Sequence, residues 1–258
     1  MELSDARILL HLLRGQSRRG SHAERLNAFY APQAAAYDDF RERLLHGRGE
    51  LVEALAPRAG ERFVELGAGT GRNLLFLGER LAVLEEVTLV DLCAPLLEQA
   101  RKRTAAMPNV RVVEADASRW QPDQPVDCVL LSYALTMMPD WRGTIDNAIA
   151  MLRPGGRLGV VDFYVSAPDP DAGLTRHGPL SRWFWPRWLG HDGVHPDPAH
   201  LALLRARLSE HQLAETRAPV PYLPGLRLPY YRFVGRVEED RSAAAASRPT
   251  HRTQASAT

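Results

Sequence analysis

The sequence of 258 residues lacks several features that define whole classes of protein. It has two cysteines, Cys93 and Cys128, each within an apolar stretch, which excludes a disulfide scaffold and favours a reducing compartment. Neither sign of charge dominates, because 32 Lys and Arg residues stand against 31 Asp and Glu residues, so we expect no nucleic-acid partner. No run approaches the roughly 20 apolar residues of a spanning helix, and no secretory signal is recognisable. We therefore expect a cytoplasmic protein that meets a membrane only peripherally.

The apolar residues are arranged as alternating strands and helices. Short β-type runs cover residues 62–66, 87–90, 110–113, 126–132 and 157–163, and helical patterns over 73–81, 95–103 and 139–152 separate them. Two further strand candidates, 213–217 and 230–237, follow a helix that begins at Asp197 and Pro198. The pattern predicts an α/β fold: a Rossmann-like, doubly wound, mostly parallel seven-stranded sheet with helices on both faces.

Changes in composition along the chain suggest its domain organisation. We expect a helical cover over residues 1–57 whose start is mobile, with a solvated loop over the Arg-rich part, residues 14–25. The main domain is predicted over 58–239, with an aromatic-rich insertion at 166–198 before the last two strands. Residues 240–258, rich in Ala, Ser, Thr and Arg, are predicted to be disordered.

A glycine-rich turn follows the first predicted strand. The sequence there is ELGAGTG, from Glu65 to Gly71, and it lies at the carboxyl end of the strand, where an open α/β sheet forms its ligand crevice. Asp91 ends the second strand, where a carboxylate can accept from both hydroxyls of a ribose. Asp116 ends the third strand and can accept from an adenine amino group. These three features predict a nucleoside-containing ligand.

The nature of that ligand depends on the acid before the glycines. A nicotinamide dinucleotide is the alternative, but Glu65 would repel its pyrophosphate and suits the amino group of a methionine moiety instead. The series resembles class I S-adenosylmethionine-dependent methyltransferases, and the resemblance implies S-adenosylmethionine as cofactor. In the same way it implies the cofactor-binding residues Tyr37, Arg41, Glu65, Gly67, Ala68, Gly69, Gly71, Asp91, Leu92, Asp116, Ala117 and Ser132.

Longer stretches between residues 28 and 237 are similar to the N-methyltransferase of betaine lipid synthesis. They are FYAPQ at 29–33, YDDFR at 37–41, LHGR at 45–48, SYALTMMPDW at 132–141, VDFYVS at 161–166, VPYLPGL at 220–226 and PYYRF at 229–233. The resemblance implies three methyl transfers from S-adenosylmethionine to the amine of diacylglyceryl homoserine. It also implies a lipid substrate at a membrane surface and a separate partner enzyme that makes this substrate.

An amine acceptor agrees with the residues available. Aromatic faces hold a methylated ammonium, and guanidinium groups pair with a carboxylate. We expect substrate contacts from Tyr30, Arg48, Tyr133, Tyr164, Trp185, Tyr231 and Arg232. The alternative for each ring is core or lid packing, and for the carboxylate the sequence does not choose among Arg41, Arg48, Arg176 and Arg232. The transfer requires no nucleophilic side chain; Tyr133, His177 and Tyr231 are candidates for a catalytic residue.

Other readings of the sequence stay open. The acceptor is alternatively phosphatidylethanolamine or a small-molecule amine, and the chain is alternatively a non-catalytic cofactor-binding subunit. His191 and His195 are spaced like metal ligands, but Gly193 and Pro196 disfavour the necessary helix, so we predict a loop and no metal. Docking to a bilayer would use either the arginines before residue 26 or the tryptophans of the insertion.

Overall fold

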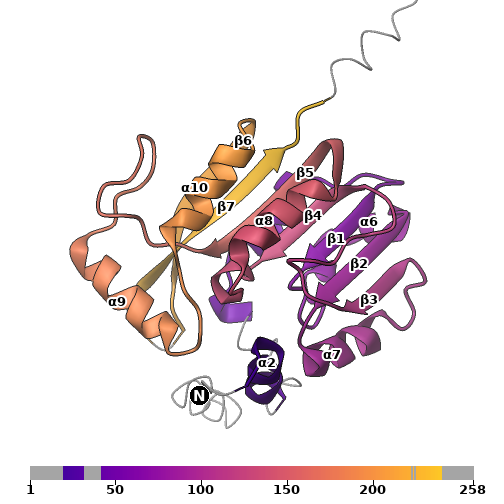
Figure 1. Cartoon of the computed structure of the whole chain (residues 1–258), viewed down its shortest axis with the longest axis horizontal. Coiled ribbons are helices and arrows are strands. Elements are labelled where there is room, and N and C mark those ends of the chain that lie inside the picture. The colour runs from indigo at the N-terminus through magenta and orange to yellow at the C-terminus, as the bar shows by residue number, and fades with distance from the viewer. Residues whose placement is uncertain (1–19, 32–41, 222, 224, 240–258) are drawn as a thin grey trace, which may run out of the picture.

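The computed structural model describes residues 20–31, 42–221, 223 and 225–239. At its centre is a seven-stranded sheet in the order β3-β2-β1-β4-β5-β7-β6 (Figure 1). The strands are β1 (Arg62–Leu66), β2 (Glu86–Asp91), β3 (Val110–Glu114), β4 (Val126–Ser132), β5 (Leu152–Phe163), β6 (His211–Pro219) and β7 (Arg227–Arg236). The first five are parallel, and β7 is antiparallel to both of its neighbours. The predicted α/β fold is confirmed.

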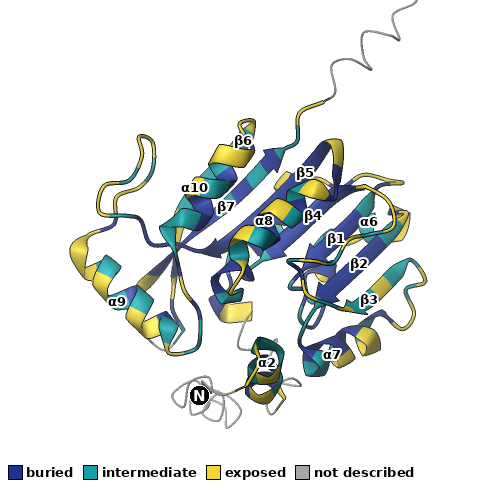
Figure 2. Cartoon of the chain, viewed as in Figure 1, coloured by how far each residue is buried: buried dark blue, intermediate teal, exposed yellow. Residues whose placement is uncertain are grey.

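Helices cover both faces of the sheet. On one face, α4 (Arg48–Leu55), α5 (Leu74–Leu77), α7 (Ala94–Thr104) and α9 (Pro179–Gly190) supply side chains to the core. On the other, α8 (Trp141–Ala150) and α10 (Pro198–Arg207) pack in front of β4, β5 and β7 in Figure 1. The central strands β4 and β5 are buried along nearly their whole length (Figure 2), as a parallel sheet covered on both faces requires.

Three elements differ from their sequence predictions. The helix expected over 73–81 is two short pieces, α5 and α6 (Arg80–Val83), because Gly78 adopts a positive φ of 55° between them. The helix that ends near residue 150 does not reach Leu152, which pairs with Val126 as the first residue of β5. The third difference concerns the N-terminal cover.

The part of the Arg-rich segment that the structure describes is largely helical, so the prediction of a loop there is wrong. Helix α2 (His22–Tyr30) begins at a capping box in which the Ser21 side chain accepts from the Glu24 backbone N–H at 3.3 Å. The Glu24 carboxylate in turn accepts from the Ser21 backbone N–H at 2.7 Å. The predicted mobile start and disordered tail lie outside the described residues.

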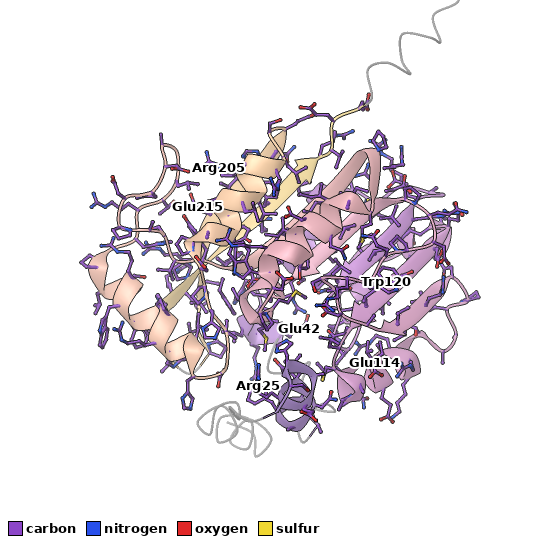
Figure 3. All side chains as sticks on the ribbon, in the orientation of Figure 1. Arg25, Glu42, Glu114, Trp120, Arg205 and Glu215 are labelled. Carbon is purple, nitrogen blue, oxygen red and sulfur yellow. The ribbon has the colours of Figure 1, made fainter. Side chains whose placement is uncertain are left out.

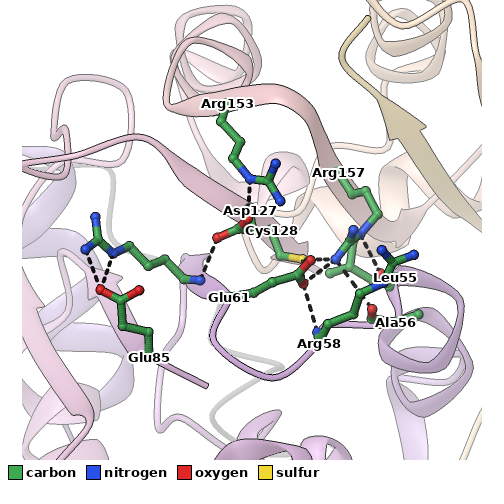
Figure 4. A network of polar contacts seen from close by, with 10 residues as sticks. Leu55, Ala56, Arg58, Glu61, Glu85, Asp127, Cys128, Arg153 and Arg157 are labelled. Atoms are coloured by element: carbon green, nitrogen blue, oxygen red, sulfur yellow. Dashed lines mark hydrogen bonds and ion pairs between the residues drawn. The ribbon is translucent and has the colours of Figure 1, made fainter. Parts of the chain in front are cut away.

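A buried polar network joins the amino ends of β1, β4 and β5 (Figure 4). The Arg157 guanidinium is ion-paired with Glu61, lies 3.0 Å from Cys128 Sγ and donates at 2.9 Å to the Leu55 carbonyl at the end of α4. Glu61 also accepts from the Arg58 backbone N–H at 2.8 Å. Burial raises the pKa of the Cys128 thiol to about 12, so this cysteine stays protonated and inert. The network fixes α4 against the sheet on the side away from the strands' carboxyl ends.

We expect Arg157→Met to destabilise the fold by about 3–5 kcal/mol, because it leaves the buried Glu61 carboxylate without its counter-charge. Denaturant unfolding followed by circular dichroism measures this change. Arg207→Met is the matched control: it removes a pair with Asp146 in which both side chains are about half exposed, and its effect is expected to be much smaller. Equal losses in the two variants would contradict a structural role for the network.

Candidate functional site

A cavity of about 340 Å³ opens at the carboxyl ends of β1, β2 and β4. The loops after these strands and after β3 form part of its wall, and α2 and the start of α4 form further parts of it. This is the crevice where the sequence places a ligand, since polar strand ends meet there. It is lined by both polar groups, such as Asp91 and Asp116, and apolar ones, such as Leu26 and Met137.

The glycine turn after β1 forms one wall of the cavity. Gly67 has φ 74°, and a Cβ added there would lie 2.6 Å from the Cβ of Ala134. Gly71 has φ 68°, and its added Cβ would lie 2.8 Å from Leu89 Cδ1. Any side chain at either position would therefore be strained and would clash, so the turn needs glycine for its shape as well as for access by a ligand.

Asp91 holds two segments of the wall together. Its Oδ2 accepts from the Gly69 backbone N–H and its Oδ1 from the Cys93 backbone N–H, both at 2.8 Å. Burial raises the pKa of this carboxyl, while the backbone hydrogen bonds oppose that shift. Each carboxylate oxygen keeps a second lone pair, so Asp91 can accept from ribose hydroxyls while it anchors the turn and the start of α7.

Glu65 lies beneath the wall and is almost fully buried. Its Oε1 accepts from Asn73 Nδ2 at 2.6 Å, whereas its Oε2 has no hydrogen-bond partner among the described residues. Burial raises the pKa of Glu65 to about 8. The buried Ser132 Oγ in the cavity wall also has no described partner. Unsatisfied buried acceptors of this kind are costly unless a ligand pairs with them.

These features fit S-adenosylmethionine. The turn and Glu65 suit its cationic methionine part, Asp91 its ribose, and Asp116 its adenine. Asp116 is exposed and its Oδ1 accepts from the Ser118 backbone N–H at 2.9 Å, so it is oriented at the edge of the cavity. When bound, the cofactor would supply an electrophilic methyl group on a sulfonium.

Helix α2 covers part of the cavity. Its residues Leu26, Phe29 and Tyr30 pack with Cys93 and Leu96 at the start of α7. Asn27 Oδ1 accepts from the Ala94 backbone N–H at 3.1 Å, which ties the two helices together. The Tyr30 hydroxyl donates to Met137 Sδ at 3.3 Å across the cavity wall. Figure 1 shows α2 below the strand ends, beside the start of α7.

Tyr133 follows β4 directly and is held in a strained conformation. Its φ is 54°, its hydroxyl donates to the His46 carbonyl at 2.6 Å, and its ring lies 4.6 Å from that of Phe163. A positive φ in a bulky residue persists only where surrounding contacts impose it. Burial raises the pKa of Tyr133 well above its usual value, so its phenol does not act as a base near neutral pH.

The structure gathers most of the predicted site residues around the cavity. Among those assigned to the cofactor, the residues on its wall are Gly67, Ala68, Gly69, Asp91, Leu92, Asp116, Ala117 and Ser132. Glu65 and Gly71 lie behind that wall, and Tyr37 and Arg41 lie outside the described residues. Of those assigned to the substrate, the residues on the wall are Tyr30, Arg48 and Tyr133.

The other substrate and catalytic candidates lie away from the cavity. Tyr164 and Tyr231 pack edge to face in the core, with ring centroids 5.9 Å apart, and Trp185 is buried on the inner side of α9. His177 is buried against Ser166, whose backbone N–H donates to its Nδ1 at 2.9 Å. Arg232 lies on β7 beside Gly47 rather than on the cavity wall. None of these residues lines the cavity, and the three aromatic residues are buried in the core.

Several residues on the cavity wall were not predicted. They are His22, Leu26, Leu45, Thr70, Arg72, Asn73, Cys93, Leu96, Ala115, Ser118, Ala134, Met137, Met138, Pro139, Asp140 and Thr144. Those that directly adjoin predicted residues, and that a broader reading of each strand end would have included, are Thr70, Arg72, Cys93, Ala115, Ser118 and Ala134. His22 and Leu26 had the capping box of α2 as their signal. The loop at His191–His195 contains no metal site, and the described residues contain no cluster of possible metal ligands.

The sequence is similar to those of known methyltransferases over part of its length. Residues 63–156 match the family of proteins described as a methyltransferase domain. A demethylmenaquinone methyltransferase of Clavibacter sepedonicus is 31% identical over 159 residues, which are 59% of this chain and 62% of that protein. The chain thus spans less than two thirds of the length of this relative.

Two solved structures show the same fold. The N-methyltransferase NodS from Bradyrhizobium japonicum, in complex with S-adenosylhomocysteine, has a TM-score of 0.61 at 17% identity, covering 83% of this chain and 99% of NodS. A Haemonchus contortus phosphoethanolamine N-methyltransferase has a TM-score of 0.67 at 13% identity, covering 86% of this chain and 61% of that one. The chain therefore has the same fold as these two proteins. Within that fold, residues 63–156 match the methyltransferase-domain family.

We expect Glu65→Gln to change how cofactor binding depends on pH. In the free protein the Glu65 carboxyl has a pKa of about 8, and a bound cation lowers it, so binding releases a proton below that pH. Affinity should therefore rise toward about pH 8 through this group, and the glutamine variant should lose that contribution.

Titration calorimetry in two buffers of different ionisation enthalpy measures the proton release directly. Asp91 and the ligand's own amino group titrate in both proteins, so the difference between wild type and variant isolates Glu65. Identical proton release in the two proteins would show that Glu65 does not sense the cofactor.

Proposed function

We propose that this protein transfers methyl groups from S-adenosylmethionine to the amine of a lipid head group, diacylglyceryl homoserine, to give the trimethylated betaine lipid. One observation carries the proposal. Three separate stretches that resemble the betaine lipid enzyme, and that exceed generic methyltransferase motifs, meet at this cavity. They contribute Tyr30, Leu45, Arg48, Tyr133, Met137 and Met138 to its wall.

The residues of this wall suit an amine that becomes a quaternary cation. The neutral nitrogen attacks the methyl carbon, the carbon–sulfur bond breaks, and its electron pair stays on sulfur. The ammonium form must lose a proton before each attack, and burial favours the neutral amine that results. The rings of Tyr30 and Tyr133 supply faces for the growing cation, each contributing about 0.5–2 kcal/mol. Alignment and exclusion of water are the main contributions that this chain has to make.

Arg48 supplies a fixed positive charge for the homoserine carboxylate. It is buried in the cavity wall, its Nε donates to the Leu45 carbonyl at 2.9 Å, and its Nη1 donates to Asn73 Oδ1 at 3.4 Å. Its Nη2 lies 3.5 Å from the partly exposed Glu42 carboxylate, so a substrate carboxylate would share this guanidinium with Glu42. These contacts orient the planar guanidinium, the group best shaped to bind a carboxylate. Burial raises the pKa of both Tyr133 and Glu65, and the nearby charge of Arg48 partly opposes that rise.

A second candidate is methylation of a quinone ring carbon. It is favoured by the name of the Clavibacter sepedonicus relative, a demethylmenaquinone methyltransferase. The two structural neighbours named as N-methyltransferases support an amine instead. Phosphatidylethanolamine, a small-molecule amine and a non-catalytic role are the remaining alternatives.

An assay of the purified protein with S-adenosylmethionine and each acceptor in turn tests the proposal. Mass spectrometry should detect mono-, di- and trimethylated diacylglyceryl homoserine, with one S-adenosylhomocysteine formed per methyl group. Methylation of demethylmenaquinone or phosphatidylethanolamine, but not of diacylglyceryl homoserine, would overturn it. Cofactor binding without turnover of any acceptor would favour the non-catalytic role.

Paired variants of Tyr133 test whether its ring holds the cation. Tyr133→Phe removes the hydroxyl but keeps the aromatic face, whereas Tyr133→Leu removes both. We expect the leucine variant to accumulate mono- and dimethylated lipid, with the third transfer slowed about tenfold relative to the phenylalanine variant. Time courses of the three products measure this ratio. A uniform decrease of all three steps in both variants would indicate a structural role for Tyr133.

A further inference from the structure

Helix α9 presents large apolar side chains to solvent. Leu180 is 75% exposed, Trp183 55% and Trp188 37%, and Figure 2 shows exposed residues along the outer side of this helix. Most tryptophan surface in a folded protein is buried, so two exposed tryptophans and a leucine on one short helix indicate a surface with a partner. We call Leu180, Trp183, Arg187 and Trp188 the outer face of α9.

The opposite side of the same helix is fixed in the core. Trp185 and Leu189, one turn apart, are each 4% exposed and belong to the same buried hydrophobic cluster as side chains of α4, β5 and β7. The Trp185 ring lies 4.9 Å from that of Phe184 and 5.6 Å from that of Trp188. The outer face is therefore held on a rigid element, and its rings cannot turn inward without displacing the core.

The charged residues on α9 itself are all basic, whereas Asp171 and Asp192 flank the segment and Glu215 contacts the loop before it. No acidic residue occurs between residues 172 and 191, whereas Arg176, Arg182 and Arg187 do. Arg187 lies over the Trp183 ring, 5.0 Å from its centroid, and donates to the Trp183 carbonyl at 2.9 Å. This pairs a cation with an aromatic ring at the surface, as interfacial helices do.

The tip of the β6–β7 hairpin extends this basic surface. The Arg227 guanidinium donates to the Arg217 carbonyl at 3.1 Å, both arginines are exposed, and the neighbouring Leu226 is 39% exposed. The segment that leads into α9 lies beside β6, because the Thr175 backbone N–H donates to Glu215 on β6 at 2.8 Å. The Arg182 guanidinium on α9 donates to the His177 carbonyl of the same segment at 2.6 Å. The end of β6 and the start of α9 are thus neighbours.

Hydrogen bonds and an ion pair hold the segments before and after α9, and one of them connects α9 to the cavity wall. The loop before α9 is anchored by the Thr175 backbone N–H, which donates to Glu215 at 2.8 Å, and by a 3.5 Å ion pair between Arg205 and Asp171 (Figure 3). After α9, the His195 backbone N–H donates at 2.7 Å to the carbonyl of Thr136, in the turn that contributes Met137 to the cavity wall. Figure 1 shows α9 and α2 along the same lower edge of the molecule.

We infer that the outer face of α9, with the adjoining hairpin tip, docks the protein on a bilayer that contains anionic phospholipid. The inference rests on the proposed lipid acceptor and selects the tryptophan-bearing insertion as the docking element. Tryptophan and leucine enter the headgroup region while the arginines pair with lipid phosphates. Within the described residues no helix is both long and apolar enough to cross a bilayer, so the attachment is interfacial.

Vesicle co-sedimentation of the full chain tests the inference without any acceptor lipid. With vesicles of phosphatidylcholine containing about 30 mol% phosphatidylglycerol, the wild type should bind at least about tenfold more tightly than the Trp183→Ala/Trp188→Ala variant. The matched control is Leu75→Ala/Val83→Ala, which removes two side chains that are each 52% exposed on α5 and α6; it should bind like the wild type. Pure phosphatidylcholine vesicles should bind the wild type weakly.

The outcomes separate this inference from the proposed function. If it is right, the tryptophan variant keeps its affinity for S-adenosylmethionine and its turnover of a short-chain, water-dispersed acceptor, but loses turnover of the acceptor embedded in vesicles. Equal vesicle binding by wild type and tryptophan variant would overturn the inference while leaving the proposed function standing. A dimer in sedimentation velocity that the tryptophan variant dissociates would also overturn it, because a second copy would then cover this face.

Discussion

The hydrogen bonds of the Asp91 carboxylate determine how the cavity is built. Asp91 accepts from the Gly69 and Cys93 backbone N–H groups, and so fixes the turn after β1 against the start of α7. Together with Glu65 it places two acidic groups where burial opposes their ionisation. A cationic ligand relieves that cost, and an anionic one would increase it. Glu65 and Asp91 therefore favour a cationic group, such as a sulfonium, over a pyrophosphate at this end of the cavity.

Much of the fold follows from the sequence, because continuous apolar runs and polar strand ends mark a parallel sheet directly. What the sequence could not supply is the direction of individual side chains. Tyr164 and Tyr231, like Tyr133, belong to stretches that resemble the betaine lipid enzyme. In the structure Tyr231 pairs with Asp162 across β5 and β7, and the rings of Tyr164 and Tyr231 lie in the core. Successive residues of a strand face opposite sides of the sheet, so an error of one residue in the predicted register exchanges the side chains that face the core with those that face the cavity. Helix α2 was recoverable from Ser21 and Glu24, whose capping box overrides the glycine nearby.

The choice of acceptor resides in a small part of the molecule. The loops after β1, β2 and β3 form one side of the cavity, whereas α2, the start of α4 and the turn after Tyr133 form the side to which the proposed acceptor is assigned. Proteins that share this fold act on chemically different acceptors, so the fold by itself does not identify one. Aromatic rings and a fixed guanidinium in those three segments are what favour a zwitterionic amine.

The buried Arg157 network and the cavity occupy opposite ends of the same strands. The stability that the Arg157 network provides should therefore depend little on which residues line the cavity. Laboratory evolution toward a new acceptor can vary the segments around Leu45 and Tyr133 extensively while the amino-end anchor preserves the scaffold. Because different ends of the strands carry the stabilising network and the cavity, one sheet can support sites for many different acceptors. This makes the chain a suitable starting point for redesign.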